Sequence, residues 1–410
     1  MTRNVSPLRS STGHLRGLRV LGPRIPFLVS LLVLMGLSTS CATTYGVTTG
    51  IEPGKDIIEA MAQVDSDLAA GRSGTALRRC AGVQALRNLP AELRIRSNAQ
   101  ADAAVRDLAL DANAEDGRWS ATQMEAFSSL DLPQVQKARL AVGAGQAHLR
   151  ENSRIRAFKF LRDFEAKNPG HPERLGAGDV LAVAGFSMIT DNGRYGIFGR
   201  YRSRGVGALE LLVLRYPFHP RCAEAYVGLA NAYEIRGDLD LAIERLEDLL
   251  LYHPDDARGP TAQARLPRLR MEQVERDDFD RAEIERAREE FEAWIARYDT
   301  QGGDDTQQLA NVRAQLSICY LRLANNDLIV SRYHKRIHQS FGTRQHAERA
   351  LDQARRSLTS LNLAAEEGES EGDKQRAALK VIDEAQTLIA WADRKDGVAM
   401  VEASDSGEGS

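Results

Sequence analysis

Aromatic residues and strand-like runs are scarce in this sequence. Only 6% of its 410 residues are Phe, Trp or Tyr, and few segments are rich in the residues that favour strands. Alanine, leucine, arginine and glutamate are abundant instead, which favours helices over a core built from sheets. A chain of this length would ordinarily form two or three globular domains. In a stack of helix pairs, however, the length of the chain reflects the number of repeats and not the number of separate cores.

Recognisable catalytic motifs are also lacking. The sequence has no His-Glu-x-x-His and no paired carboxylates in a known frame. The glycine-rich stretch 193–205 interleaves basic and aromatic residues, which suits contact with acidic groups, but it lacks the strand context and the Lys-Ser/Thr ending of a phosphate-binding loop. We interpret it as an insertion packed on the neighbouring hairpin, with a protein-contact loop as the alternative.

Two clusters suggest metal ions, and neither has a full set of ligands. His334 and His338 lie four residues apart on one face of a predicted helix, with His346 further along, but no carboxylate or cysteine has the spacing to complete a site. The acidic segment 277–280 lacks the glycine and the twelfth-position glutamate of a calcium loop. We therefore expect a basic solvated face and an acidic turn, no cofactor and no enzymatic activity.

Cysteines are few and far apart. The chain has four, with no Cys-x-x-Cys pair. Cys80, Cys222 and Cys319 each lie inside an apolar helical pattern, so we predict that they are small buried hydrophobic residues.

The first 41 residues have the organisation of a secretory leader. Five arginines and no acidic residue accompany the apolar run 26–37, which is shorter than the roughly 20 helical residues that cross a bilayer. The run ends in Leu37-Ser-Thr-Ser-Cys41, which resembles the lipobox of bacterial lipoproteins, in which the cysteine is acylated and becomes the new N-terminus. We predict lipidation at Cys41; an ordinary cleaved leader with an incidental cysteine and a single anchor helix are the alternatives. By the same resemblance, Ala42 in place of aspartate favours the outer membrane, with the protein on its periplasmic side.

Removal of this leader makes the chain mildly acidic. Five of the 54 basic residues lie in the leader, so 49 remain after its removal, together with all 57 acidic residues. The formal charge is then about −8. Together with export, this charge argues against nucleic acid as a partner.

Residues 223–256 read as one complete helix-turn-helix repeat of 34 residues. Small residues that let two helices approach, Ala230 and Ala242, alternate with large ones. Gly237-Asp238 provides the turn and Pro254 the stop. The aromatic and large apolar positions are filled by Tyr226, Leu229, Tyr233 and Leu246. This spacing matches the tetratricopeptide (TPR) family.

The same spacing recurs in residues 137–170, so the chain contains a repeat. Gly145, Ala157, Leu161 and Pro169 occupy the small, small, large and breaker positions. A third pair, 175–189 with 206–216, carries an inserted loop at 190–205. Further helices are expected at 262–274, 282–298, 307–325, 328–339, 344–363 and 374–394. Upstream, we expect a hairpin at 56–89 with Gly71 at its turn, and helices at 94–112 and 120–130.

These patterns predict an all-α, right-handed superhelical solenoid of TPR-type hairpins behind a signal peptide. We divide the chain into the leader 1–41, a tether 42–55, irregular N-terminal hairpins 56–130, TPR repeats 131–256, C-terminal TPR-like repeats with a capping helix 257–396, and a disordered tail 397–410.

Residues 137–361 also resemble the BamD-type lipoproteins of the outer-membrane β-barrel assembly machine. The resemblance is carried by Leu212-Val-Leu-Arg-Tyr-Pro-Phe-His-Pro220, by the stretch from Gly237 to Pro254, and by Arg322-Leu-Ala324 followed by Asp327-Leu-Ile-Val-Ser-Arg-Tyr333. The chain departs from the family in its extra segment 56–130, in the missing final proline and in an insertion near 338–343.

This resemblance implies a scaffold that binds an Omp85-type barrel-assembly subunit and unfolded outer-membrane proteins. It implies partner contacts at Arg322, with Asp327 and Tyr333 in the same segment; for Arg322, a solvated arginine pairing locally with Asp327 is the alternative. It also implies substrate contacts on the concave face, at Arg139, Gln146, Asn231 and Glu234. A general TPR adaptor of another cell-envelope assembly and an enzyme on a helical scaffold are the alternative functions.

Overall fold

The computed structural model describes residues 55–191, 194–195, 199–274, 281–299, 306–366 and 372–407. The leader, Cys41, nearly all of the predicted tether and the acidic segment 277–280 lie outside these ranges. Among the described residues, none of the helices is both long and apolar enough to cross a membrane.

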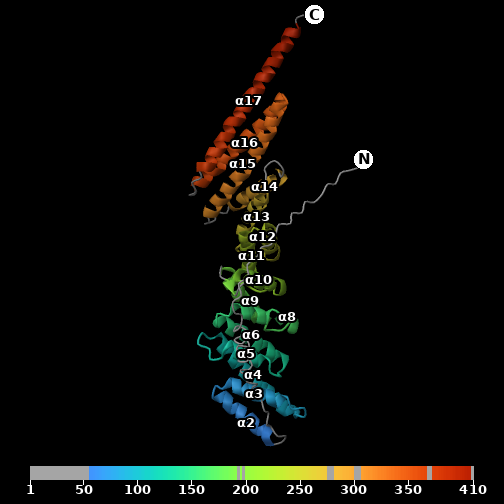
Figure 1. The fold of residues 1–410 in the computed structure, drawn as a ribbon, viewed down its shortest axis with the longest axis vertical. Coiled ribbons are helices and arrows are strands. Elements are labelled where there is room, and N and C mark those ends of the chain that lie inside the picture. Colours follow the sequence, from blue (N-terminus) through green and yellow to red (C-terminus); the bar gives the residue numbers. More distant parts are fainter. Residues whose placement is uncertain are drawn as a thin grey trace, which may run out of the picture.

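The described chain is a stack of helical hairpins (Figure 1). We call the two members of each hairpin its first and second helix. In chain order the pairs are α2 (Lys55–Ala69) with α3 (Ser73–Gln84), α4 (Ala91–Asn113) with α5 (Ala121–Ser128), α6 (Gln134–Arg150) with α7 (Arg154–Leu161), α9 (Arg174–Ile189) with α10 (Tyr201–Arg215), α11 (Cys222–Arg236) with α12 (Leu239–Tyr252), α13 (Gly259–Gln273) with α14 (Arg281–Tyr298), and α15 (Thr306–Arg336) with α16 (Ser340–Glu366). The second pair is irregular, because α4 packs against α3 and α6, and α5 packs against α6, rather than the two against each other. The short helix α8 (Phe164–Lys167) precedes α9, and α17 (Gly372–Gly407) closes the stack.

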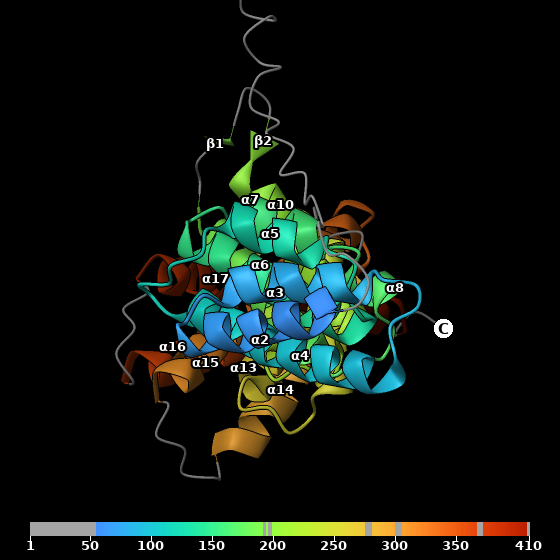
Figure 2. The ribbon, with the colours of Figure 1, turned by 90° about the horizontal axis from the view of Figure 1, so that it is seen from below.

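The hairpins follow one another along a single long axis, with α2 and α17 at opposite ends (Figure 1). Viewed along that axis, α5, α7 and α10 lie on one side of the stack and α2 and α4 on the other (Figure 2). The fold is therefore the predicted right-handed solenoid of TPR-type hairpins, and in the described ranges its regular elements are helices apart from two-residue strands.

The α11–α12 hairpin shows why the repeat spacing produces this geometry. Ala230 and Ala242 are both fully buried, as expected for the small side chains that let two helices approach closely. Gly237 ends α11 with a φ of +80°, in the left-handed region that favours glycine. Its N–H donates to the Glu234 carbonyl, and the N–H of Asp238 donates to the Tyr233 carbonyl, which satisfies the end of the helix.

Each hairpin shares its interior with the next through helices that have two buried faces. Helix α6 contributes Val142 to one apolar cluster and Leu140 to the cluster before it. Helix α13 in the same way connects the central cluster, through Leu269, to the following one, through Met271. Helix α15 connects the last two clusters. The core is therefore a continuous strip along the stack, as a solenoid requires.

Helices α9 and α10 approach each other so closely that a residue with a Cβ atom would not fit at one point of their contact. A Cβ atom on Gly205 would lie 2.6 Å from the backbone nitrogen of Ile189. The predicted insertion at 190–205 is shorter than expected, because α10 already begins at Tyr201 and carries this glycine into the crossing. Short antiparallel strands, β1 (Arg194–Tyr195) and β2 (Gly199–Arg200), form part of what remains of the loop.

The C-terminal region differs from the predicted helices. Helix α15 is continuous where the sequence suggested a break at 326–327, and the chain reverses only near His338, whose φ is +59°. Asn326 and Asp327 have no helix-breaking neighbour, and both side chains are buried against Arg281, at 2.9 and 3.2 Å from its Nη1 atom. This tertiary contact keeps α15 helical across the expected turn. Helix α17 continues to Gly407, into the segment 397–410 for which the sequence predicted disorder.

The buried position of Leu246 in α12 gives a direct test of the packing. Replacement by alanine should lower the free energy of unfolding by about 2–5 kcal/mol, because it removes a fully buried leucine and leaves a cavity. Leu251, on the same helix and 69% exposed, is the matched control, and Leu251→Ala should change stability by less than about 0.5 kcal/mol. Urea unfolding followed by circular dichroism measures both, and equal effects would contradict the described packing.

Candidate functional site

A groove opens on the first-helix side, where α4, α6 and α9 lie side by side. It has a volume of about 430 Å³. Its lining comes from the C-terminal end of α4 (Ala112, Asn113, Ala114, Glu115), from α6 (Gln146, Leu149, Arg150) and from α9 (Asp179, Val180, Val183). We call it the first-helix groove. The structure places the predicted contact residue Gln146 in this groove.

Arg150 fixes one wall of the first-helix groove. Its Nη1 atom donates to the carbonyl oxygens of Asp111, Ala112 and Ala114, at 3.0, 3.1 and 3.3 Å. These carbonyls end α4, so the guanidinium satisfies acceptors that the helix leaves open and complements its dipole. Arg150 is therefore engaged within the fold, whereas Val183 of α9, which also lines the groove, is 45% exposed.

The other residues predicted for the concave face fall into two groups. Asn231 is exposed on α11. Arg139 pairs with Glu173 at 2.8 Å, and Glu234 accepts hydrogen bonds from Arg265 and Arg268 at 2.7 and 2.6 Å. Arg139 and Glu234 therefore connect neighbouring repeats, and their use by a partner would compete with these ion pairs.

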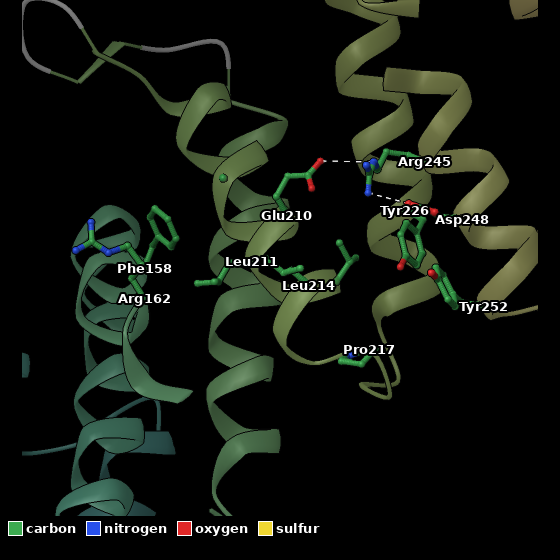
Figure 3. Close-up of a pocket in the computed structure, with 12 residues that line it drawn as sticks. Phe158, Arg162, Glu210, Leu211, Leu214, Pro217, Tyr226, Arg245, Asp248 and Tyr252 are labelled. Atoms are coloured by element: carbon green, nitrogen blue, oxygen red, sulfur yellow. Dashed lines mark ion pairs between the residues drawn. The ribbon is translucent and has the colours of Figure 1, made fainter. Parts of the chain in front are cut away.

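A second groove lies on the second-helix side, across α10 (Figure 3). We call it the second-helix groove; it has a volume of about 670 Å³. It is lined by Phe158 and Arg162 of α7, by Gly207, Glu210, Leu211, Val213 and Leu214 of α10, by Pro217, by Tyr226 of α11, and by Arg245, Asp248 and Tyr252 of α12. Leu214 and Tyr252 are 71% and 61% exposed at its edge.

Charged groups gather at the α12 side of the second-helix groove. Arg245 lies 2.8 Å from Asp248, 2.5 Å from Glu244 and 3.8 Å from Glu210. The Tyr233 hydroxyl donates to Glu210 at 2.7 Å. Burial raises the pKa of Asp248 and the neighbouring carboxylates add to the rise, although Arg245 opposes it. The groove therefore combines apolar walls with an acidic patch.

The sequence did not identify this second-helix groove. Its open space depends on how α7, α10 and α12 lie relative to one another; at Gly207 itself, an added Cβ atom would already be in van der Waals contact with Phe158, at 3.8 Å. The available signals were Gly207 inside an otherwise regular helix and the outward-facing Leu214, and neither reports the distance between two helices.

The segment predicted to dock the barrel-assembly subunit is mostly internal. Arg322 donates to the carbonyl oxygens of Met271 and Val274, both at 2.8 Å, at the end of α13. Asp327 is fully buried and lies 2.9 Å from His346. Only Tyr333 is exposed, at 59%. A partner contact through Arg322 and Asp327 stays a prediction; at the fully buried Asp327 it would require α15 and α16 to move apart.

The structure shows how the histidines and cysteines singled out in the sequence are placed. The rings of His334 and His346 stack with their centroids 5.6 Å apart, and within the described ranges no three metal-ligating side chains gather into a site. Cys80, Cys222 and Cys319 are all buried free thiols, as predicted. Burial raises the pKa of these thiols to about 12, 11 and 12, so they remain protonated and unreactive.

Comparisons with known proteins identify no family. No family model matches this chain, and no curated protein matches it. Among solved structures, a Rap protein complexed with competence and sporulation factor is similar at 12% identity and a TM-score of 0.28, over 83% of this chain and 90% of that chain. The P58(IPK) TPR domain gives 13% and 0.23, over 82% and 99%. NprR in complex with its cognate peptide NprX gives 12% and 0.24, over 86% and 99%. At such low scores these likenesses carry no argument about partners.

The ion pairs of Glu234 predict a pH-dependent contribution to stability. Burial acts to raise the pKa of this carboxyl, but the hydrogen bonds and charges of Arg268 and Arg265 outweigh it, so the pKa is lowered. Glu234→Gln should therefore destabilise the fold by about 1–3 kcal/mol at pH 7. A lowered pKa stabilises the fold above about pH 4.3, the ordinary glutamate value, and this stabilisation disappears as the pH falls through the folded value.

Urea unfolding of the wild type and of Glu234→Gln at pH 7, 5, 4 and 3 measures this difference, with Glu283→Gln, an exposed glutamate of α14, as the control. The difference between Glu234→Gln and the wild type should be the same at pH 7 and 5 and should shrink only below about pH 4.3. A difference that stays constant from pH 7 down to 3 would contradict the role of these ion pairs.

Proposed function

We propose that this chain is a non-enzymatic scaffold that binds other proteins through its TPR surfaces. The observation that carries the proposal is the first-helix groove, a concave site built from three successive first helices and edged by the exposed Val183. Helices α9 and α11 also leave Leu175 and Ile235 exposed, at 55% and 66%. Apolar side chains exposed on a rigid helical scaffold are typical of surfaces that bind other proteins.

The finer part of the proposal is a lipoprotein of the outer membrane that acts in β-barrel protein assembly. It is supported by the lipobox-like sequence ending at Cys41 and by the resemblance of residues 137–361 to the BamD-type lipoproteins. In this function the acyl chains at Cys41 supply the membrane affinity, and the repeats bind an Omp85-type subunit and unfolded outer-membrane proteins. The acidic balance of the chain without its leader argues for protein rather than nucleic acid as the partner.

A specific observation favours a second candidate, an adaptor in another assembly of the cell envelope. Arg322 and Asp327, which the resemblance implies as docking residues, are engaged inside the stack with α13 and α16. A partner of a different kind would use other surfaces of the same repeats.

Affinity purification from detergent-extracted membranes, followed by mass spectrometry, tests the function. The wild type should capture envelope proteins, and an Omp85-type protein among them supports the first candidate over the second. Val183→Asp should reduce this capture, because it places a charge on the edge of the first-helix groove. Leu363→Asp is the control, since Leu363 is 40% exposed on the distant α16. Capture of no envelope protein by the wild type would contradict a scaffold function.

Loss of the acylated cysteine should detach the chain from membranes. Cys41→Ser removes the thiol that carries the lipid, and the described repeats contain no membrane-spanning helix to replace it. Labelling with radioactive palmitate and membrane fractionation measure the effect: the wild type should be labelled and should sediment with membranes, and the variant should do neither. A labelled variant would contradict acylation at Cys41.

A further inference from the structure

The second-helix groove is not used by the function proposed above, which acts through the first-helix side. The two grooves open on different sides of the stack, one across α4, α6 and α9 and the other across α7, α10 and α12. A ligand in one therefore leaves the other accessible. The inference below rests on the proposed scaffold function and adds a second partner site to it.

The shape of the second-helix groove suits a segment of polypeptide. Its floor is one face of α10, where Gly207, Glu210, Leu211 and Leu214 follow the spacing of three and four residues that aligns side chains on a helix. Helix α7 forms one wall and α12 the other (Figure 3). Gly207 adds no side chain to this floor, and the Phe158 ring lies close to it, since a Cβ atom on Gly207 would come within 3.8 Å of Phe158.

Apolar side chains at the groove are left facing solvent. Leu214 is 71% exposed and Tyr252 is 61% exposed. The Tyr252 ring stacks on the buried Tyr226, with centroids 6.5 Å apart, so it is held in place rather than free to turn away. A rigid aromatic edge and an exposed leucine beside a groove are typical of sites that accept apolar anchor side chains.

The charged side chains at this groove indicate the charge of the ligand. Glu210, Glu244 and Asp248 share the single guanidinium of Arg245. The nearby Glu247 lies 2.7 Å from Arg270, which Glu290 also contacts at 2.5 Å. At the end of α7, Arg162 is paired with Asp163 at 3.1 Å and adds little net charge. Glu210 and Asp248 line the groove and Glu244 lies beside them, so three carboxylates share one cation on the α12 side. These four side chains have a formal charge of −2, which favours a positively charged ligand.

We propose that the second-helix groove binds a partner protein through an apolar segment that carries lysine or arginine. The apolar side chains of this segment lie over Leu211 and Leu214 between α7 and α12. Its basic side chain lies beside Glu210 and Asp248, where it supplies the positive charge that Arg245 alone does not. The scaffold can then hold two proteins at once, one on each side of the stack.

Synthetic peptides test this site on the full chain, without knowledge of the natural partner. The probes are two fluorescent 14-residue peptides with the same leucine and phenylalanine positions, one with lysine and the other with glutamate at the remaining positions. Fluorescence anisotropy should show that the lysine peptide binds at least about tenfold more tightly than the glutamate peptide, and added salt should reduce this difference.

Matched variants locate the binding. Leu214→Ser should weaken binding of the lysine peptide about tenfold, because a leucine at the edge of the groove is lost. Leu110→Ser is the control, since Leu110 is also 71% exposed but lies on α4, and it should have no effect. Glu210→Gln should reduce the preference for lysine over glutamate while the fold is kept. Gly207→Trp should block binding, because the indole fills the floor.

Several results would overturn the inference. They are equal binding of the two peptides, an equal effect of Leu214→Ser and Leu110→Ser, or a wild-type chain that sediments as a dimer which Leu214→Ser separates, since a second copy would then occupy the groove. If the wild type captures envelope proteins but fails these tests, only this inference fails. If the wild type captures none, the scaffold function itself fails.

Discussion

The close crossing of paired helices is the constraint on which the rest of this structure depends. Ala230 and Ala242 are fully buried where α11 meets α12, and Gly205 leaves no room for a side chain where α10 meets α9. Such crossings keep each hairpin thin, so its outer faces are buried only when the next hairpin stacks against it. Helices α6, α13 and α15 have two buried faces for this reason, and a continuous core with a long exterior is the result.

The use of charge follows from the same stacking. Many of the ionic side chains on the helices pair across repeats, as Glu234 does with Arg265 and Arg268, and as the buried Asp327 does with Arg281. These pairs fix the angle between neighbouring hairpins and are not open to partners. What remains for binding is the surface where neighbouring helices leave a gap, and the described residues provide such a gap on each side of the stack, one across the first helices and one across the second.

The sequence predicted the parts of the fold that depend on local spacing. The turn at Gly71, whose φ is +67°, and the small buried side chains at the crossings follow from positions within one repeat. The continuity of α15 could not be predicted, because it depends on Arg281, 45 residues before Asn326. The same limit applies to the site: the repeat position of Gln146 predicted that it faces a groove, whereas the second-helix groove depends on how α7, α10 and α12 lie relative to one another, which no local pattern reports.

Energy transfer between the two ends of the stack tests the continuous solenoid most directly. Dyes would be attached to cysteines introduced at Ile58 in α2 and Leu379 in α17, both exposed, in the Cys41→Ser chain; the native thiols of the described residues are buried and would stay unlabelled. Since α2 and α17 lie at opposite ends (Figure 1), we predict transfer close to background. A compact globule of 410 residues has a radius of gyration of about 22 Å, so efficient transfer between the dyes would contradict the stacked architecture and the two-sided scaffold built on it.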